Sequence, residues 1–489
     1  MNIKLVGRII SMVLLIEAVF MVVPVIIGAV DGERDVVAAF SITIAIILAV
    51  CALLLTLCRG KKMNESGFYS QEGFVTTGLS WIFMSLLGSL PFIISGQIPN
   101  FFDAWFETVS GFTTTGASIL TNVEGLSRGM LYWRSFTHWL GGMGVLVFMM
   151  AIIPAASKRK NSDMFLLRAE SPGPSVGKFT PHMRSTAMIL YLIYIVLTVL
   201  CVLFLRFGGK MPWFDAVCTA YGTAGTGGFG IKNDSIASYS VFAQNTTTIF
   251  MLLFGVNFNI FYLVILGKLK TVFKNEEFRT YIMIWLTATL VVFVNIFSMY
   301  SSAGESLRHA AFQTSSIMTT TGFSSVDFEQ WPTLSKSVLL VLMLIGASAG
   351  STGGGMKVSR LMLLAKSLRR DVRRALHPSR SVSIHLDGAA VSEQTISSVN
   401  AYLVAYACII VVSFVAVSVD GKSITTSLSA VIACFNNIGP GFEMVGATGN
   451  YSGFSAFSKL ILIADMLLGR LEIFPLLAML SRSAWDRRL

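Results

Sequence analysis

Four short segments of this sequence each end in a loop that carries glycine beside hydroxyl or amide residues. They read FFDAWFETVSGFTTTGAS from Phe101, WFDAVCTAYGTAGTGGFG from Trp213, LRHAAFQTSSIMTTTGFS from Leu307 and ITTSLSAVIACFNNIGPGFE from Ile424. Glycine adopts dihedrals that are closed to other residues, so such a loop can direct its carbonyl oxygens toward an axis. A ring of carbonyls can replace the water shell of a cation. These segments therefore predict cation coordination by backbone oxygens, without catalysis.

The four segments are copies of one element when they are aligned on their glycines. Thirteen residues earlier stands a residue that is polar and suited to starting a helix in most copies, Asp103, Asp215, His309 or Thr426. Six residues before the glycine the side chain is always small, as expected where short helices pack closely: Ser110, Gly222, Ser316 and Ala433. Each copy thus predicts a short helix that enters the membrane and ends in an irregular loop.

The rest of the chain has the composition of a bilayer protein. Of its 489 residues, 54% are hydrophobic and only 13% are charged, against about 25% charged in an ordinary soluble domain. Apolar runs of about 20 residues can cross the hydrocarbon core, and in lipid they must be helices. The sequence contains ten, near residues 9–30, 36–57, 74–96, 135–157, 185–205, 241–267, 280–304, 337–365, 401–419 and 457–481.

Basic residues follow every second run, which predicts that both termini are cytoplasmic. The basic clusters are Lys4 and Arg8; Arg59, Lys61 and Lys62; Lys158, Arg159, Lys160, Arg168, Lys178 and Arg184; Lys268, Lys270, Lys274 and Arg279; Lys366, Arg369, Arg370, Arg373, Arg374 and Arg380; and Arg482, Arg487 and Arg488. No basic patch is interleaved with stacking aromatics, so a nucleic-acid partner is excluded despite the net charge of +11.

The predicted fold is an all-α polytopic membrane protein with an N-terminal helix pair and four pseudo-symmetric repeats of helix, pore helix, filter loop and helix around one pore. A half-helix that enters from outside directs the negative end of its dipole toward the membrane centre, where it attracts cations. The expected units are residues 1–65 for the pair and residues 66–160, 180–270, 276–380 and 395–489 for the repeats.

Two further features fall inside the predicted spans. Residues 346–355 form a run of glycine and small residues, for which we weigh a close helix-packing surface against a loop that blocks the path. Arg470 lies near the middle of the last run, where a charge is costly unless it has a partner. It could pair with Asp465 or Glu472, or it could face the pore.

The loops TTTGA, TGGFG, TTTGF and NNIGPG, together with ASAGSTGGG from Ala347 and LLGRLEIFP around Arg470, resemble the Trk/Ktr/HKT superfamily of potassium transporters, specifically its bacterial Trk membrane subunit. The similarity covers nearly the whole chain. It implies potassium uptake, with rubidium also accepted and sodium less so, in a bacterial cytoplasmic (inner) membrane. It also implies a homodimer controlled by a cytoplasmic nucleotide-binding subunit.

By the same resemblance, the potassium-binding filter comprises Thr114, Thr115, Gly116, Thr226, Gly227, Gly228, Thr320, Thr321, Gly322, Asn437, Ile438 and Gly439. The fourth loop departs from the family pattern, which leaves Gly439 or Gly441 as its filter glycine; we favour Gly439. The implied gate is a glycine-rich loop that meets a pore arginine: Gly346, Ala347, Ser348, Ala349, Gly350, Gly353, Gly354, Gly355 and Arg470.

Several alternatives remain beside this interpretation. A potassium symporter coupled to protons or sodium would need titratable groups along the path, and few are visible. A membrane-embedded enzyme is disfavoured because no carboxylate pair, metal-ligand cluster or nucleophile with a base recurs at one depth. Polar residues within the spans are expected to hydrogen-bond between helices: His138, Asn257 and Asn259. Asp103 and Asp215 could also concentrate cations at the mouth.

Overall fold

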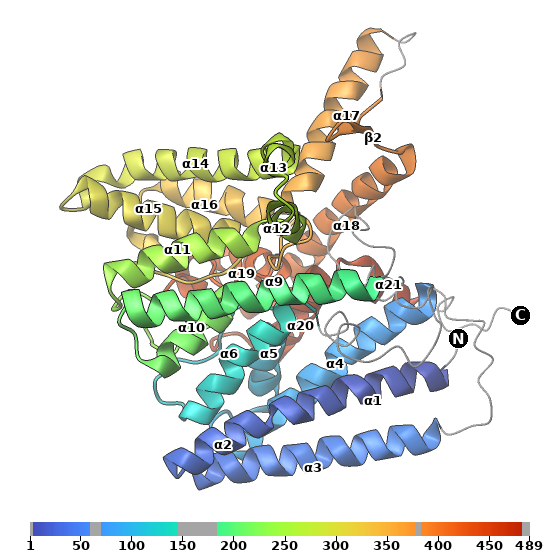
Figure 1. Cartoon of the computed structure of the whole chain (residues 1–489), viewed down its shortest axis with the longest axis vertical. Helices are drawn as coiled ribbons and strands as arrows, with labels where there is room; N and C mark the ends of the chain where they lie inside the picture. Colours follow the sequence, from blue (N-terminus) through green and yellow to red (C-terminus); the bar gives the residue numbers. More distant parts are fainter. Residues whose placement is uncertain (1–2, 59–69, 145–182, 378–382, 482–489) are drawn as a thin grey trace, which may run out of the picture.

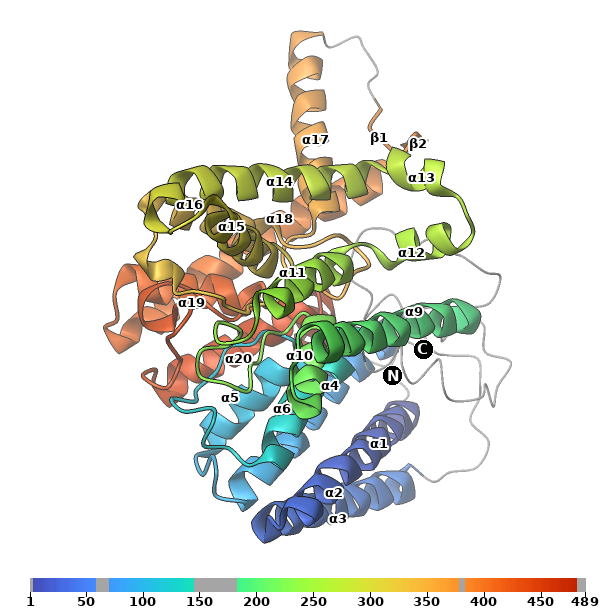
Figure 2. The same ribbon diagram turned by 60° about the vertical axis from the view of Figure 1, so that its left-hand side comes forward.

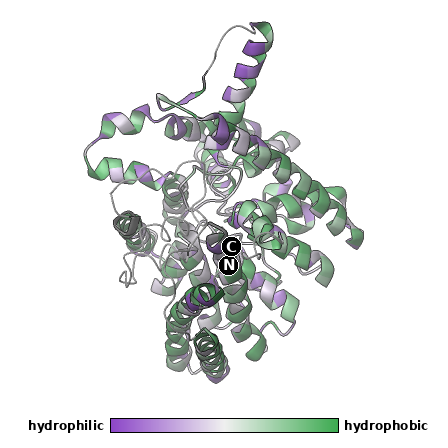
Figure 3. Cartoon of the chain, turned by 90° about the vertical axis from the view of Figure 1, so that its right-hand side faces the viewer, coloured by the Kyte–Doolittle hydropathy of each residue, from purple (hydrophilic) through white to green (hydrophobic). Residues whose placement is uncertain are grey.

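The computed structural model describes residues 3–58, 70–144, 183–377 and 383–481. The regular secondary structure of this part of the chain is helical, apart from a short antiparallel hairpin of β1 (His385–Leu386) and β2 (Ala389–Ala390). Figure 3 shows hydrophobic residues along most of the long helices. The predicted all-α membrane fold is therefore confirmed.

The N-terminal helix pair forms a separate layer at one side of the body (Figure 1). α1 (Ile3–Phe20) continues into α2 (Val22–Asp31), and the chain then turns at Gly32 into α3 (Arg34–Leu57). Gly32 has φ of 75°, a left-handed conformation that glycine adopts without a Cβ penalty. The pair packs against the first repeat through apolar side chains that include Val13, Phe40 and Met84.

Four repeats follow, and each contains a long first helix, a short pore helix and a second helix. The first repeat contains α4 (Ser70–Ile94), α5 (Phe101–Phe112) and α6 (Arg128–Gly142). The second contains α9 (Met183–Leu203), the π-helical turn η1 (Phe204–Gly208), α10 (Trp213–Ala224), α11 (Val241–Gly255) and α12 (Phe258–Ile265), with the short connecting helix α13 (Leu269–Lys274) after it.

The third and fourth repeats have the same order of elements. The third contains α14 (Glu276–Ile296), η2 (Phe297–Met299), α15 (Ala303–Met318), η3 (Phe328–Gln330), α16 (Thr333–Ile345) and α17 (Val358–Leu376). The fourth contains α18 (Glu393–Val417), η4 (Ser418–Asp420), α19 (Ile424–Phe435), η5 (Glu443–Val445), α20 (Ala456–Arg470) and α21 (Phe474–Leu480).

The second helix of each repeat is shorter than the apolar run that predicted it. Within the described residues, six spans have the length and composition to cross a membrane, one of them formed by α1 with α2; the pair α11–α12, bent by 93°, adds a seventh if it counts as one span. Continuous helices over 241–267 and 457–481 were therefore wrong predictions, whereas the break within 337–365 was expected. For the run 135–157, residues 145–157 lie outside the described part of the chain.

Three of the four pore helices begin with a side-chain cap, but not at the residue the alignment suggested. Asn100, Ser302 and Ser423 accept hydrogen bonds from backbone N–H groups of α5, α15 and α19. Pro212 precedes α10. The expected starting residues lie farther inside: Asp103, Asp215 and Thr426 in the first turn, and His309 deeper within α15. Short polar residues just upstream reach the free N–H groups, so the prediction was wrong.

α17 differs from the other long helices because it leaves the body and projects from it (Figures 1 and 2). Its sequence carries Arg369, Arg373 and Arg374, so much of it is hydrophilic in Figure 3. Two of the predicted basic clusters, 59–62 and 482–488, lie outside the described residues, as does the cluster 158–184 except for Arg184 at the start of α9. The sidedness of the termini therefore stays a prediction.

Candidate cation filter and gate

The four loops that follow the pore helices share one backbone conformation. The residue two positions before each aligned glycine is left-handed, with φ of 57° at Thr114, 54° at Thr226, 58° at Thr320 and 55° at Asn437. The aligned glycines have φ of 80°, 75°, 85° and 93° at Gly116, Gly228, Gly322 and Gly439. Gly441 is not among the residues with positive φ, so Gly439 occupies the position equivalent to the other three.

A repeated hydrogen bond holds each loop against its own pore helix. The N–H before the aligned glycine donates to a carbonyl five residues earlier, at 2.8–2.9 Å. The pairs are Thr115 to Ser110, Gly227 to Gly222, Thr321 to Ser316 and Ile438 to Ala433. The acceptors are the small residues of the alignment, so small side chains occur where the loop folds back on the helix.

The four loops close into a ring, here called the filter ring (residues 114–116, 226–228, 320–322 and 437–439). A methyl group at Gly116 would overlap the carbonyl oxygen of Gly227 in the next loop. The same relation recurs between Gly228 and Thr321, between Gly322 and Ile438, and between Gly439 and Thr115. Because the fourth loop touches the first, the structure brings all twelve predicted filter residues together around one centre.

The pore helices end at this ring. α5, α10, α15 and α19 are followed directly by Thr113, Gly225, Thr319 and Asn436, the residues that lead into the ring. The C-terminal end of a helix carries about −0.5 of an elementary charge. Four such ends around one centre make the filter ring favourable for a cation without a carboxylate in it.

The side chains that support the ring differ from loop to loop. In loops 1 and 3, hydroxyl pairs brace the backbone: Thr113 Oγ1 lies 2.8 Å from Thr115 Oγ1, and Thr319 Oγ1 lies 2.7 Å from Thr321 Oγ1. Loop 2 has no such pair and packs against the ring of His138, which a methyl group at Gly227 would overlap. The sequence suggested none of these supports, because each depends on tertiary contact.

Asn437 of loop 4 reaches across to loop 1. Its Nδ2 donates to Thr115 Oγ1 at 2.9 Å and to the carbonyl of Met466 at 2.9 Å. Tyr406 donates to Asn436 Oδ1 at 3.0 Å behind the same loop. Asparagines therefore take over, through longer side chains, part of the bracing that threonines provide elsewhere.

A buried ion pair lies behind loops 1 and 2. Arg134 Nε lies 2.6 Å from Glu107 Oε1, with exposures of 4% and 0%. Arg134 also donates to the carbonyl of Gly230 at 2.8 Å and stacks 3.6 Å from the centre of the Phe229 ring. Sequence reasoning missed this pair. Its signal was two opposite charges within apolar segments, which are costly unless they meet.

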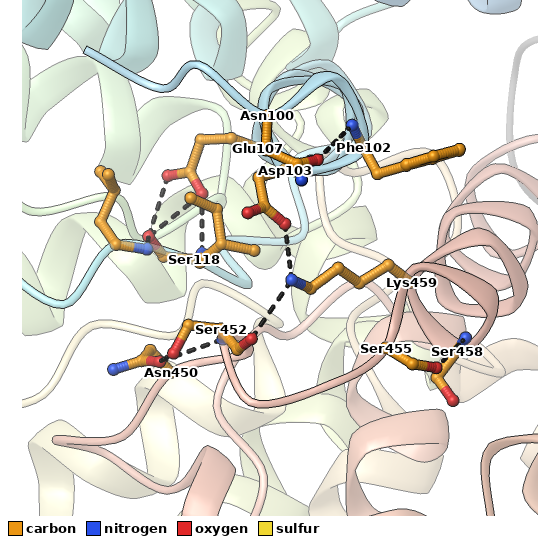
Figure 4. A network of polar contacts seen from close by, with 12 residues as sticks. Asn100, Phe102, Asp103, Glu107, Ser118, Asn450, Ser452, Ser455, Ser458 and Lys459 are labelled. Carbon is orange, nitrogen blue, oxygen red and sulfur yellow. Dashed lines mark hydrogen bonds and ion pairs between the residues drawn. The ribbon is translucent and has the colours of Figure 1, made fainter. Parts of the chain in front are cut away.

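The outer seam between repeats 4 and 1 is closed by another ion pair (Figure 4). Lys459 Nζ lies 2.5 Å from Asp103 Oδ1 and donates to the carbonyl of Ser452 at 3.2 Å. On repeat 2, Tyr239 donates to Asp215 Oδ2 at 2.8 Å. Both carboxylates that could have concentrated cations at the mouth thus have partners.

Thr426, the fourth of the expected helix starters, instead binds a carboxylate outside the spans. Its hydroxyl donates to Glu443 Oε2 at 2.8 Å, and the Ser423 hydroxyl donates to the same oxygen. These hydrogen bonds lower the pKa of Glu443. The pair of hydroxyls fastens the segment that follows loop 4 to the start of α19.

Residues 346–355 form a loop, here called the gate loop, that lies against the filter ring. Gly354 N donates to Thr320 Oγ1 at 2.6 Å, and a methyl group at Gly353 would lie 2.8 Å from the carbonyl oxygen of Thr319. From the other side, Ala349 N donates to Glu277 Oε1 at 2.7 Å. The segment is an irregular loop and not a continuous helix, so a simple helix-packing surface does not describe it.

Arg470 ends α20 and reaches three backbone carbonyls. Its guanidinium donates to Thr352 at 2.8 Å, Gly141 at 2.5 Å and Gly142 at 2.7 Å. Asp465 accepts a hydrogen bond from Ser413 at 2.6 Å, and Glu472 pairs with Arg360. Arg470 therefore connects repeats 1, 3 and 4 at the level of the gate loop.

The other polar residues predicted within spans divide into two groups. Asn257 Oδ1 accepts from Asn259 N at 3.0 Å and caps α12, and its Nδ2 donates to Glu277 at 3.4 Å. That contact joins two helices, as expected. Within the described residues, neither ring nitrogen of His138 forms a hydrogen bond, so its expected bonding role was wrong; its ring packs 4.2 Å from that of Phe229.

Comparison with known proteins agrees with this architecture. A family model described as "Cation transport protein" matches residues 37–485. The Trk system potassium uptake protein TrkH of Salmonella typhimurium is 36% identical over 99% of this chain and 100% of its own length. The TrkG protein of Escherichia coli is 32% identical over 85% of this chain and 86% of its own.

A solved structure has the same fold. The crystal structure of the potassium transporter TrkH from Vibrio parahaemolyticus superimposes with a TM-score of 0.86 at 31% identity, and it covers 99% of this chain and 100% of its own. These relatives are transport proteins and not enzymes, as the sequence predicted. Full-length similarity, the family model and the shared fold lead to one conclusion: the chain belongs to the TrkH family of cation transport proteins.

Proposed function

We propose that this protein takes up potassium ions across the cytoplasmic membrane of a bacterium, through the filter ring. The observation that supports this most directly is the closure of four equivalent loops, each with the same pair of left-handed residues. Such a ring can present carbonyl oxygens to a dehydrated ion from four sides. The potassium ion is the transported substrate in this proposal.

Potassium is the proposed ion for two reasons. The similar proteins from Salmonella and Vibrio are named as potassium transporters. All four aligned positions are glycine, as in the potassium-selective members that the sequence resembles. In the proposed filter, the residues that bind the ion are Thr114, Thr115, Gly116, Thr226, Gly227, Gly228, Thr320, Thr321, Gly322, Asn437, Ile438 and Gly439.

The proposed gate is the gate loop together with Arg470. A guanidinium below a carbonyl ring opposes a cation electrostatically, and a loop in the path blocks it sterically. The hydrogen bonds from Arg470 to Thr352 and from Gly354 to Thr320 favour the closed position of the loop. Opening requires that these bonds break together.

We also propose that the chain works as a homodimer with a cytoplasmic nucleotide-binding subunit. The projecting helix α17 supports this proposal, because it offers surface that the body does not cover (Figure 2). Three apolar residues on it, spaced four apart, are 52–70% exposed: Leu368, Val372 and Leu376. Exposed apolar residues beside arginines suit a protein contact.

The test is ion flux into liposomes that contain the purified protein, with potassium, rubidium and sodium measured separately. We expect potassium and rubidium to enter faster than sodium. Equal entry of sodium would overturn the proposed filter. Potassium entry that requires an imposed proton or sodium gradient would favour the coupled symporter over a passive pathway.

A further inference from the structure

The fourth loop of the filter ring lacks the brace that loops 1 and 3 contain. The paired hydroxyls of those loops belong to the residues one and three positions before the glycine. In loop 4 these positions are Ile438 and Asn436, and isoleucine has no hydroxyl. Asn436 and Asn437 brace the part of loop 4 before Gly439, and the peptide after Gly439 is held by a separate hydrogen bond.

The peptide that follows Gly439 offers only one point of attachment. The next residue is Pro440, which has no N–H group to donate. The carbonyl oxygen of Gly439 is consequently the one hydrogen-bonding group of that peptide. It accepts a hydrogen bond from the hydroxyl of Tyr451 at 2.7 Å.

Tyr451 is itself held rigidly. The residue is 2% exposed, and its ring lies 5.4 Å from that of Phe106 and 5.9 Å from that of Phe454. Its N–H donates to the carbonyl of Ser118 at 2.8 Å, just beyond the first filter glycine. A buried tyrosine that forms hydrogen bonds through both its hydroxyl and its backbone N–H can fix the direction of the carbonyl that the hydroxyl binds.

These two hydrogen bonds join the last repeat to the first. The hydroxyl of Tyr451 holds loop 4, and its N–H holds the chain that leaves loop 1. Gly439 packs directly on this neighbour, because a methyl group there would lie 2.6 Å from the carbonyl oxygen of Thr115. Beside Tyr451, Ser452 accepts from Lys459, which pairs with Asp103 of α5 (Figure 4).

Within the part of the chain that the structure describes, the equivalent carbonyls of the other three loops have no such side-chain partner. Within the described residues, no side-chain donor reaches the carbonyl oxygens of Gly116, Gly228 or Gly322, whereas Gly439 has one. The junction between loops 4 and 1 is thus held by an additional hydrogen bond, from Tyr451 to Gly439.

We propose that Tyr451 is a positioning residue of the cation filter: its hydroxyl holds the Gly439 carbonyl and thereby sets the width of the filter ring where loop 4 meets loop 1. This inference rests on the proposed function, since it assumes that the ring selects the ion. Loss of the hydroxyl frees the Gly439–Pro440 peptide to rotate. A ring with one loosened junction adapts to a smaller ion, so discrimination against sodium falls.

The test is the variant Tyr451→Phe, compared with wild type and with Tyr281→Phe in liposome flux. Tyr281 is the matched control, because it is also buried and its hydroxyl donates to a backbone carbonyl, that of Leu252, outside the filter ring. We expect Tyr451→Phe to lower the potassium-to-sodium ratio about three- to tenfold, the change that corresponds to one lost hydrogen bond. Tyr281→Phe should leave the ratio unchanged.

The outcomes separate the two proposals. A wild-type protein that admits sodium as readily as potassium overturns the proposed function itself. A selective wild type with an equally selective Tyr451→Phe overturns the role of Tyr451 alone. If Tyr451→Phe does not yield folded protein, Phe106→Leu loosens the tyrosine ring and keeps its hydroxyl; it should lower the ratio in the same direction, and an unchanged ratio rejects the inference.

Discussion

The guanidinium of Arg470 and the carbonyl oxygen of Thr352 lie 2.8 Å apart, although 118 residues separate them in the chain. This hydrogen bond holds the gate loop of repeat 3 to the end of α20 in repeat 4. The same guanidinium binds Gly141 and Gly142 of repeat 1, so one side chain joins three of the four repeats.

Replacement of Arg470 by alanine should raise potassium flux. Each hydrogen bond from a charged donor contributes roughly 1.5–3 kcal/mol, so loss of the guanidinium should increase flux about tenfold or more in the absence of any partner protein. Liposome flux measures this directly. Arg128→Ala is the control, since it removes an arginine whose partner, Asp31, lies in the N-terminal pair; an Arg470→Ala flux equal to that of the control contradicts the gate assignment.

The substitution Gly116→Ser should reduce selectivity for potassium over sodium. A Cβ at this position overlaps the carbonyl oxygen of Gly227, and φ of 80° strains any side chain, at a cost of about 1–3 kcal/mol. The ring must widen or distort on that side. The ratio of potassium to sodium flux should fall, while Gly304→Ser, at a site with open space around it, should leave the ratio as it is. An unchanged ratio in Gly116→Ser refutes the filter assignment.

The hydroxyl of Thr320 should stabilise the closed gate loop. In Thr320→Val the N–H of Gly354 loses its acceptor, and an unsatisfied buried donor costs about 1–3 kcal/mol. We expect a rise in basal potassium flux of at least about fivefold on that account. Thr43→Val makes the same change at a buried threonine whose hydroxyl donates to the carbonyl of Ala39 in its own helix, α3, and its flux should equal that of wild type. Equal flux in both variants removes Thr320 from the gate.

The buried pair of Glu107 and Arg134 should matter more for stability than any exposed pair. Glu107→Gln leaves the Arg134 charge buried without its partner, which costs about 3–5 kcal/mol. Thermal unfolding in detergent should therefore show a clear drop in Tm. Asp31→Asn, which breaks the more exposed pair with Arg128, should cost less than about 1 kcal/mol. Equal shifts in the two variants would falsify this prediction.

The filter loops were predictable from the sequence because their conformation depends on residue type. Left-handed glycines leave a repeated local pattern, and the aligned set Gly116, Gly228, Gly322 and Gly439 took the same dihedrals in the structure. The small residues six positions earlier were also visible, although their use as carbonyl acceptors was not.

The broken second helices were harder to foresee, because their signals are faint. In the run 241–267 the only cue for a bend is Gly255 followed closely by Asn257, whose side chain caps the new helix α12. In the last run, the chain turns at Glu472 and Ile473, with φ of 63° and 64°. Neither residue type favours that conformation, so packing and not local preference produces the turn.

The partners of the charged side chains could not be predicted from the sequence, for a different reason. Glu107 and Arg134 are 27 residues apart and meet where α6 packs against α5 within repeat 1. Lys459 and Asp103 are 356 residues apart, and the closed arrangement of repeats brings them together. The predicted helix starts were wrong for a local reason. Asp103 is a suitable capping residue, but Asn100 lies three residues upstream and its side chain accepts from the free N–H groups of α5.

The four loops of the filter ring are encoded at four places in one gene, and each has its own supports. In a pore built from four identical chains, every mutation appears four times and its effect is multiplied. Here a mutation changes a single quarter of the ring, so selectivity can drift in small steps during evolution. Engineers can likewise adjust this pore one quadrant at a time, with loop 4 and its tyrosine as an independent point of control.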